Sequence, residues 1–168
     1  MPYLPNEIWL DIVAYCDPRD LWLSLRPSNR QLSDCVEQYF RDELLPQTVI
    51  SLPIALPTYD IRQPMRGKAV FQYTECARGE GQSKDRVSYC FSKTEPWHYQ
   101  AQFLDRWQGM REKADGRLVD KLRWDIQLID KTVTVGLKEA RIDAAQAVEA
   151  EAAPLSFEWK SNMTRFFR

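Results

Sequence analysis

Few side chains in this sequence are of the types that carry out catalysis or bind metals. The only histidine, His98, stands between Trp97 and Tyr99. A zinc site needs several cysteine or histidine ligands at close spacing, and the four cysteines are scattered without a C-x-x-C pair. We therefore expect His98 to be a surface or strand-end residue, and we expect neither a metal site nor a bound cofactor.

The remaining catalytic patterns are equally weak. No G-x-S-x-G or Cys–His signature offers a nucleophile with its base. Glu95 and Asp105 could form an acid–base pair, but carboxylates near strand ends are common. The glycines of Gly79-Glu80-Gly81 are followed by Lys84 and Asp85, which does not match a phosphate-binding loop. We expect no catalytic residues, and a protein that is not an enzyme.

Aromatic and cationic side chains suggest recognition instead. Trp97, Trp107 and Arg106 could stack on and hold a bound protein, and we take them as candidate substrate-binding residues. The alternative is that the tryptophans belong to the core and the charges to a solvated loop. Nucleic acid is a poor fit because acidic residues lie among the basic ones. These acidic residues are Asp105, Glu112, Asp115 and Asp120.

Composition and termini point to an intracellular protein of one or two small domains. The chain has 168 residues, a hydrophobic share of 44% and a formal net charge of −1. The N-terminus lacks the basic start of a signal peptide, and Glu7 and Asp11 interrupt its apolar residues. No apolar run approaches a membrane span, and the cysteines are expected to be reduced thiols. We expect the cytoplasm or nucleus, and no contact with a membrane.

The elements that would position these residues begin with helices over 4–45. Ile8 and Ile12 lie one turn apart in the first helix, which Leu4-Pro5 opens. Asp17 is placed to cap a second helix with Pro18 in its first turn. Leu21 and Leu25 carry the apolar face of that second helix. Ser28 and Gln31 have capping-box spacing at the start of the third helix.

Three helices this short cannot bury their apolar residues among themselves. Independent folding below about 40 residues usually needs a disulfide, a metal or a partner. Part of the apolar surface must therefore pack elsewhere. Either the chain's own sheet or another protein covers it.

After the helices, the hydrophobic pattern changes from helical to strand-like. We predict a proline-rich connector over 47–68, in which 48–52 could form an edge strand. Alternation then predicts a hairpin of Phe71 and Tyr73 with Val87, Tyr89 and Phe91. A third strand is predicted over 99–103, followed by a charged loop or short helix over 107–116.

The clearest hairpin pairs the segments 122–128 and 133–137 across Asp130-Lys131. Residues 138–153 are predicted to be a surface helix or a mobile loop. Leu155, Phe157 and Trp159 alternate as a last strand, and the tail 163–168 could be docked or frayed. The predicted fold is α+β: a helical head over 1–46, and a body over 69–168 that forms an antiparallel sandwich or open barrel of about six or seven strands.

The helical stretch resembles an F-box. The family pattern combines a Leu-Pro opening, an acidic residue, spaced aliphatics, an Asp-Pro-x-Asp-Leu turn, a Leu-Arg pair and a small polar residue before arginine. Here it reads Leu4-Pro5, Glu7, Ile8, Ile12, Asp17-Pro18-Arg19-Asp20-Leu21, Leu25-Arg26 and Asn29-Arg30. The run Leu-Arg-x-x-Asn-Arg-Gln-Leu is similar to heads of fungal F-box proteins.

The resemblance implies a non-catalytic, substrate-recruiting subunit of a cullin-RING (SCF-type) ubiquitin ligase. The head would dock on the adaptor subunit of the ligase, and the β-rich body would present an unidentified client protein. The adaptor contacts implied are Leu4, Pro5, Ile8, Ile12, Leu21 and Leu25. The alternative is a ligand- or glycan-binding module whose head packs on its own sheet. An open pocket lined by Tyr73, Tyr89 and Trp124 would favour that alternative.

Overall fold

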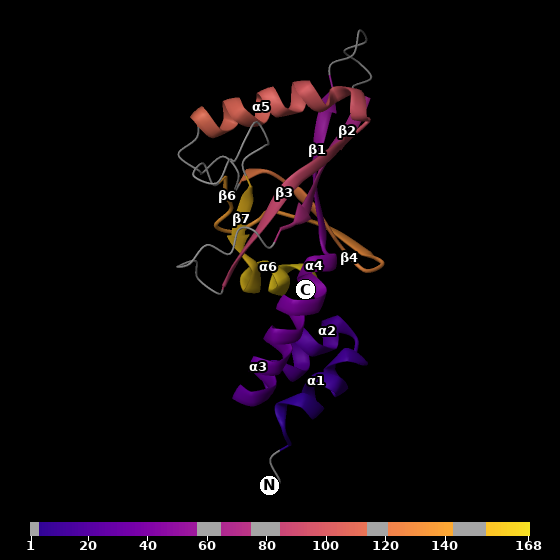
Figure 1. The fold of residues 1–168 in the computed structure, drawn as a ribbon, viewed down its shortest axis with the longest axis vertical. Helices are drawn as coiled ribbons and strands as arrows, with labels where there is room; N and C mark the ends of the chain where they lie inside the picture. Colours follow the sequence, from indigo (N-terminus) through magenta and orange to yellow (C-terminus); the bar gives the residue numbers. More distant parts are fainter. Residues whose placement is uncertain (1–3, 57–64, 75–84, 114–120, 143–153) are drawn as a thin grey trace.

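The fold combines an N-terminal group of helices with one antiparallel sheet. A computed structural model describes residues 4–56, 65–74, 85–113, 121–142 and 154–168. The helices of residues 4–47, called the head below, form one end of an elongated molecule, and the sheet with its two later helices forms the body (Figure 1). The prediction of an α+β fold is confirmed.

The head contains α-helices and two π-helical turns. Its elements are α1 (Asn6–Ala14), α2 (Pro18–Asp20), η1 (Leu21–Leu25), α3 (Arg30–Tyr39), η2 (Phe40–Leu44) and α4 (Leu45–Gln47). Asp17 caps α2 as predicted, because its carboxylate accepts hydrogen bonds from the backbone N–H groups of Arg19 and Asp20 at 2.8 and 3.4 Å. The predicted cap at Ser28 is wrong by one residue. Asn29 caps α3 by accepting from the Leu32 N–H at 2.8 Å, while the Ser28 hydroxyl donates back to the Ser24 carbonyl at 2.8 Å.

The body is built on one seven-stranded antiparallel sheet with the order β5-β4-β1-β2-β3-β7-β6. The sheet curls into half of a barrel, so the predicted open barrel is nearer to the structure than the predicted sandwich. The strands are β1 (Val49–Leu56), β2 (Met65–Tyr73), β3 (Arg86–Glu95), β4 (Trp124–Leu128), β5 (Lys131–Val135), β6 (Arg141–Ile142) and β7 (Leu155–Glu158).

The segment predicted as a proline-rich connector carries β1, which is an interior strand of this sheet and not the predicted edge strand over 48–52. β1 pairs with β2 along its whole length, with Pro53 opposite Lys68. β4 pairs with β1 only over residues 49–51, so Pro53 lies beyond the end of that second ladder. A proline is tolerated in a strand where no neighbour needs its missing N–H, and for this reason Pro53 did not end the strand.

Both predicted hairpins are confirmed. Phe71 pairs with Phe91 and Tyr73 with Tyr89 between β2 and β3. Between β4 and β5, Leu128 pairs with Lys131, so Ile129 and Asp130 make the turn, one residue before the predicted turn at Asp130-Lys131. The predicted loop around Gly79-Glu80-Gly81 lies outside the described residues.

The predicted strand over 99–103 is wrong, because a helix occupies this region. The 3-10 turn η4 (Trp97–Tyr99) leads into α5 (Gln100–Lys113). Phe103 and Trp107 are one helical turn apart and are 4% and 0% exposed. Their rings stack at 5.8 Å and both pack against Phe71 of the sheet. The burial of Phe103 and Trp107 against the sheet requires helical spacing. This burial stabilises a helix more than the alternation of polar and apolar residues before Phe103 stabilises a strand.

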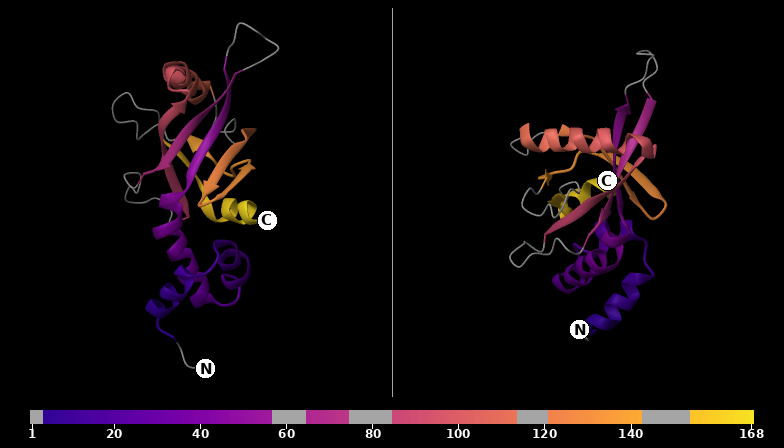
Figure 2. Two further views of the ribbon diagram at one scale, coloured as in Figure 1. Left: turned by 90° about the vertical axis from the view of Figure 1, so that its right-hand side faces the viewer. Right: turned by 45° about the horizontal axis from the view of Figure 1, so that its top comes forward.

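The C-terminal residues dock between the head and the sheet. The strand predicted from Leu155 is β7, but Trp159 starts α6 (Trp159–Phe167) instead of ending the strand. Glu158 caps this helix by accepting from the backbone N–H of Ser161 at 2.8 Å. Figure 2 shows α6 lying between the head and the sheet. Of the segment 138–153, Arg141–Ile142 forms β6, and 143–153 lies outside the described residues.

Candidate functional site: an exposed aliphatic ridge on α1

A row of apolar side chains follows the outer side of the first helix. Ile8 and Ile12 are four residues apart, so they lie above one another on one side of α1, and Leu4 precedes the helix, next to its N-cap Pro5. They are 39%, 44% and 41% exposed, and Tyr15, further along, is 93% exposed. We call these four residues the α1 ridge. They are four of the six large apolar side chains exposed among the described residues.

The other side of α1 is fixed against α3. Val13 is fully buried, and Gln31 of α3 donates hydrogen bonds to the Leu4 carbonyl at 2.7 Å and to the Asn6 side chain at 2.8 Å. α1 lies at the end of the molecule furthest from α5 (Figures 1 and 2). The ridge is therefore presented on a fixed helix, away from the sheet.

Four of the six predicted adaptor contacts share this surface. Leu4, Ile8 and Ile12 belong to the ridge, and Pro5 is exposed beside them at the N-cap of α1. Leu21, in contrast, is 0% exposed and belongs to the core, because η1 packs against α6. Leu21 is thus unable to reach a partner in this structure, and Leu25 is only partly buried against the core.

The inner side of the head packs on the body through aromatic rings. The rings of Trp22 and Phe40 are 4.8 Å apart, and Trp22 lies 5.4 Å from Trp159 of α6. The indole N–H of Trp22 donates to the Thr164 hydroxyl at 3.0 Å. Phe40 meets Phe167 edge to face at 5.9 Å. This side of the head is covered by the chain itself.

Ion pairs around Glu37 connect the same surfaces. Its carboxylate lies 2.7 Å from Arg26 in the head and 2.7 Å from Lys160 in α6, and Lys160 also lies 2.7 Å from Asp85. Burial opposes the charged form of Glu37, but hydrogen bonds and charge from Lys160 and Arg26 outweigh it and lower its pKa. Burial also opposes the charge on Lys160, yet Asp85 and Glu37 raise its pKa. Both groups are therefore held in their charged forms, tying the head to the body.

The residues predicted to bind a substrate are not brought together as one site. Trp107 belongs to α5 and is fully buried against Phe71 of the sheet, so its assignment as a binding residue is wrong, and the alternative of a core tryptophan holds for it. Arg106 is exposed on α5. Trp97 is 79% exposed in η4, next to His98, which is exposed as predicted.

The proposed acid–base pair finds no support in the contacts of Glu95. This carboxylate forms ion pairs with Lys93 at 2.8 Å and Lys68 at 3.1 Å. Hydrogen bonds from Lys93 and Lys68 lower its pKa, and a general acid at neutral pH requires the opposite shift. No group of three or more metal-ligating side chains occurs within the described ranges.

The side chains expected to line a ligand pocket fill the core instead. Tyr89 and Trp124 are both 0% exposed. Tyr89 stacks on Phe157 at 5.6 Å and donates its hydroxyl to the Leu45 carbonyl at 3.0 Å; its burial raises the pKa of the phenol. Trp124 packs against Phe71 and Trp107. The open pocket that would favour a ligand-binding module is therefore not formed by Tyr89 and Trp124.

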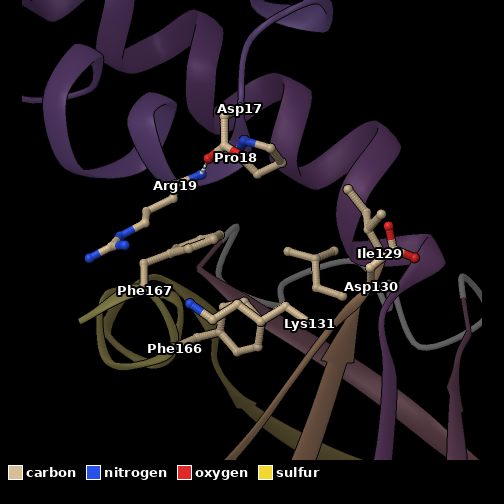
Figure 3. A pocket seen from close by; sticks show the side chains of 9 residues that line it. Asp17, Pro18, Arg19, Ile129, Asp130, Lys131, Phe166 and Phe167 are labelled. Atoms are coloured by element: carbon tan, nitrogen blue, oxygen red, sulfur yellow. Dashed lines mark hydrogen bonds between the residues drawn. The ribbon is translucent and has the colours of Figure 1, made fainter.

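A hollow of about 450 Å³ lies where the head meets the body. It is lined by residues 17–19 at the start of α2, 128–131 at the β4–β5 turn and 166–167 in α6 (Figure 3). We call it the junction hollow. Sequence reasoning missed it because three distant segments form it. The signal in the sequence was the aromatic and basic tail over 163–168.

Comparison with known proteins finds no family model, no curated protein and no solved structure that matches this chain. Across the described residues, no helix combines the length and apolar character needed to span a lipid bilayer.

Proposed function

We propose that this chain is an F-box-type, non-catalytic subunit of a cullin-RING ubiquitin ligase, acting in the cytoplasm or nucleus. The α1 ridge docks on the adaptor subunit of the ligase, and the body recruits a client protein. The single observation that carries the proposal is the exposure of Ile8 and Ile12 on α1, together with Leu4 just before it, in a stretch whose sequence resembles the F-box opening.

The α1 ridge leaves apolar surface in water, and burial of that surface by a partner would be favourable. Full burial of an aliphatic side chain contributes about 1.5–3 kcal/mol. Ile8 and Ile12 keep 44% and 41% of their surface in water, so the chain obtains only part of that contribution from each. Anchors repeated every four residues on one helix are typical of helix-in-groove recognition. A helical groove on the adaptor would complete the burial.

The function also needs the client to be held at a defined place. The contacts of Trp22 and Glu37 with α6 fix the head to the body. A client bound to the body would then be kept near the ubiquitin-carrying enzyme, and its effective concentration there would rise without any chemistry in this chain.

The test is co-purification of the full chain with the adaptor subunit. Wild type should form a complex, and Ile8→Asp/Ile12→Asp should weaken it by at least about a hundredfold, because two charges would enter an apolar interface. Leu4→Ala/Pro5→Ala should weaken it less. Trp97→Asp is the matched control, since it also replaces an exposed apolar side chain, at the other end of the molecule. Absence of a wild-type complex, or an unchanged complex with the double aspartate variant, would refute the proposal.

A further inference from the structure

We propose that the junction hollow binds an acidic peptide segment in which a carboxylate stands beside an aliphatic or aromatic side chain. Its role as the client's recognition site rests on the proposed function, whereas the binding itself does not. The hollow has a volume of about 450 Å³, within the range of sites that hold ligands.

Two cations at the hollow indicate an anionic occupant. The Arg19 guanidinium and the Lys131 ammonium group form no ion pair with any residue of the described ranges. Lys131 Nζ instead lies over the rings of Phe166 and Phe167, 5.4 and 6.0 Å from their centroids. An arginine fork binds a carboxylate through two parallel hydrogen bonds, so Arg19 and Lys131 together suit a glutamate or aspartate.

The two acidic residues of the lining do not neutralise this pair. The Asp17 carboxylate accepts the backbone N–H groups that begin α2. In Figure 3, Asp130 lies on the opposite side of the hollow from the charged ends of Arg19 and Lys131. The positive side of the hollow therefore remains available to a ligand.

Ile129 supplies the apolar contact. It is the first of the two turn residues between β4 and β5, and its φ is 53°. That left-handed conformation is unfavourable for a β-branched residue and suits glycine at this turn position. Its side chain is also 52% exposed. Ile129 therefore combines an unfavourable backbone conformation with a side chain that is only half-buried, and neither stabilises the fold. Residues in unfavourable backbone conformations cluster at sites that bind ligands.

The lining therefore matches a peptide better than a single ion. A positive end and an apolar edge lie on either side of an aromatic floor made by Phe166 and Phe167 (Figure 3). A carboxylate and an apolar side chain close together in one peptide would occupy both ends at once. A simple anion would leave Ile129 in water.

The experiment selects peptides from a random heptapeptide library displayed on phage, using the purified full chain. Enriched sequences should carry Asp or Glu within two residues of an aliphatic or aromatic side chain. A fluorescein-labelled copy of an enriched peptide then gives a Kd by fluorescence anisotropy. Arg19→Glu/Lys131→Glu should raise this Kd by at least about tenfold, because both cations become repulsive.

The matched control is Arg66→Glu/Lys138→Glu, which makes the same change in net charge at exposed residues that do not line the hollow and should leave the Kd unchanged. Failure to enrich any peptide, enrichment of peptides without acidic residues, or an unchanged Kd in the Arg19/Lys131 variant would overturn the proposal.

Ile129→Gly separates binding from folding. Glycine accepts the left-handed conformation, so the midpoint of thermal unfolding should be kept or raised, while the peptide Kd should rise several-fold. An unchanged Kd would remove Ile129 from the site. Ile8→Asp/Ile12→Asp should bind the peptide like wild type and lose only the adaptor, so the two proposals fail by different measurements.

Discussion

The inner and outer sides of the head differ in what covers them. On the inner side, Trp22 is 3% exposed and lies among Phe40, Trp159 and the Thr164 hydroxyl. On the outer side, Ile8 and Ile12 are 44% and 41% exposed. Both sides carry large apolar side chains at helical spacing, yet only the inner one is packed by the body.

Apolar side chains at helical spacing can serve either folding or binding, and the sequence pattern does not distinguish these two roles. Apolar residues that the chain itself buries contribute to folding. Those that it leaves in water contribute little to folding and are available to a partner. Substitutions on the inner side should therefore cause large losses in the free energy of unfolding. Substitutions on the outer side should mainly weaken binding to the adaptor.

The largest expected effect comes from removing the centre of the inner side. Trp22→Ala should lower the free energy of unfolding by about 3–5 kcal/mol, because it leaves a cavity among Phe40 and Trp159. Urea unfolding followed by circular dichroism measures the change. A loss below about 1 kcal/mol would mean that the inner side does not depend on this residue.

The next effect concerns charge. Glu37→Gln should cost about 1.5–3 kcal/mol near pH 7, since Arg26 and Lys160 would lose a charged acceptor. The lowered pKa of Glu37 means that its contribution is complete above its ordinary value of about 4.3 and is lost as the pH falls through the folded value. Wild type should therefore lose more stability than the variant between neutral and acidic pH.

Urea unfolding at a series of pH values tests this dependence. Glu43→Gln, at an exposed position in the neighbouring turn η2, serves as the control and should follow wild type. Parallel pH curves for wild type and Glu37→Gln would exclude the carboxylate as a pH-sensitive link between head and body.

A smaller effect is expected from the hydrogen bond across the junction. In a double-mutant cycle of Trp22→Phe and Thr164→Val, the coupling energy should be about 0.5–1.5 kcal/mol, the net contribution of one such bond. Additive losses would show that ring packing alone joins Trp22 to α6.

The smallest effect belongs to the outer side. Ile8→Ser and Ile12→Ser should each lower the free energy of unfolding by no more than about 1 kcal/mol, because 44% and 41% of these side chains already lie in water. The same variants should weaken adaptor binding. A loss of about 2 kcal/mol or more in unfolding would show that the ridge is part of the core, which would contradict its role as a free surface.

Local signals predicted much of the fold. Asp17 before Pro18 predicted the start of α2, and the alternation around Trp124 predicted the β4–β5 hairpin, with its turn placed one residue too late. The errors came where two patterns compete. The short alternation ending at Phe103 resembled a strand, although Phe103 and Trp107 also stand four residues apart, and packing on Phe71 decided for the helix.

The candidate site was predicted only in part. Ile8 and Ile12 are predicted to lie one turn apart on one side of a helix, and in α1 they do; both are exposed, as is Leu4 before the helix. Leu21 carries the same kind of side chain at an equally plausible helical position, but it is enclosed by the core. Which side of a helix meets the rest of the chain depends on where α6 docks, and α6 lies more than a hundred residues further along.

The order of the amino acids is sufficient for the periodicity, for the Asp17 cap and for the presence of more apolar helical surface than so short a head can bury. These features depend on residues within a few positions of one another. The tertiary structure alone decided that Leu21 and Trp22 are covered, that the α1 ridge is not, and that Arg19, Ile129 and Phe166 meet at one hollow. Such outcomes depend on long-range packing, in which distant segments compete for the same apolar surface.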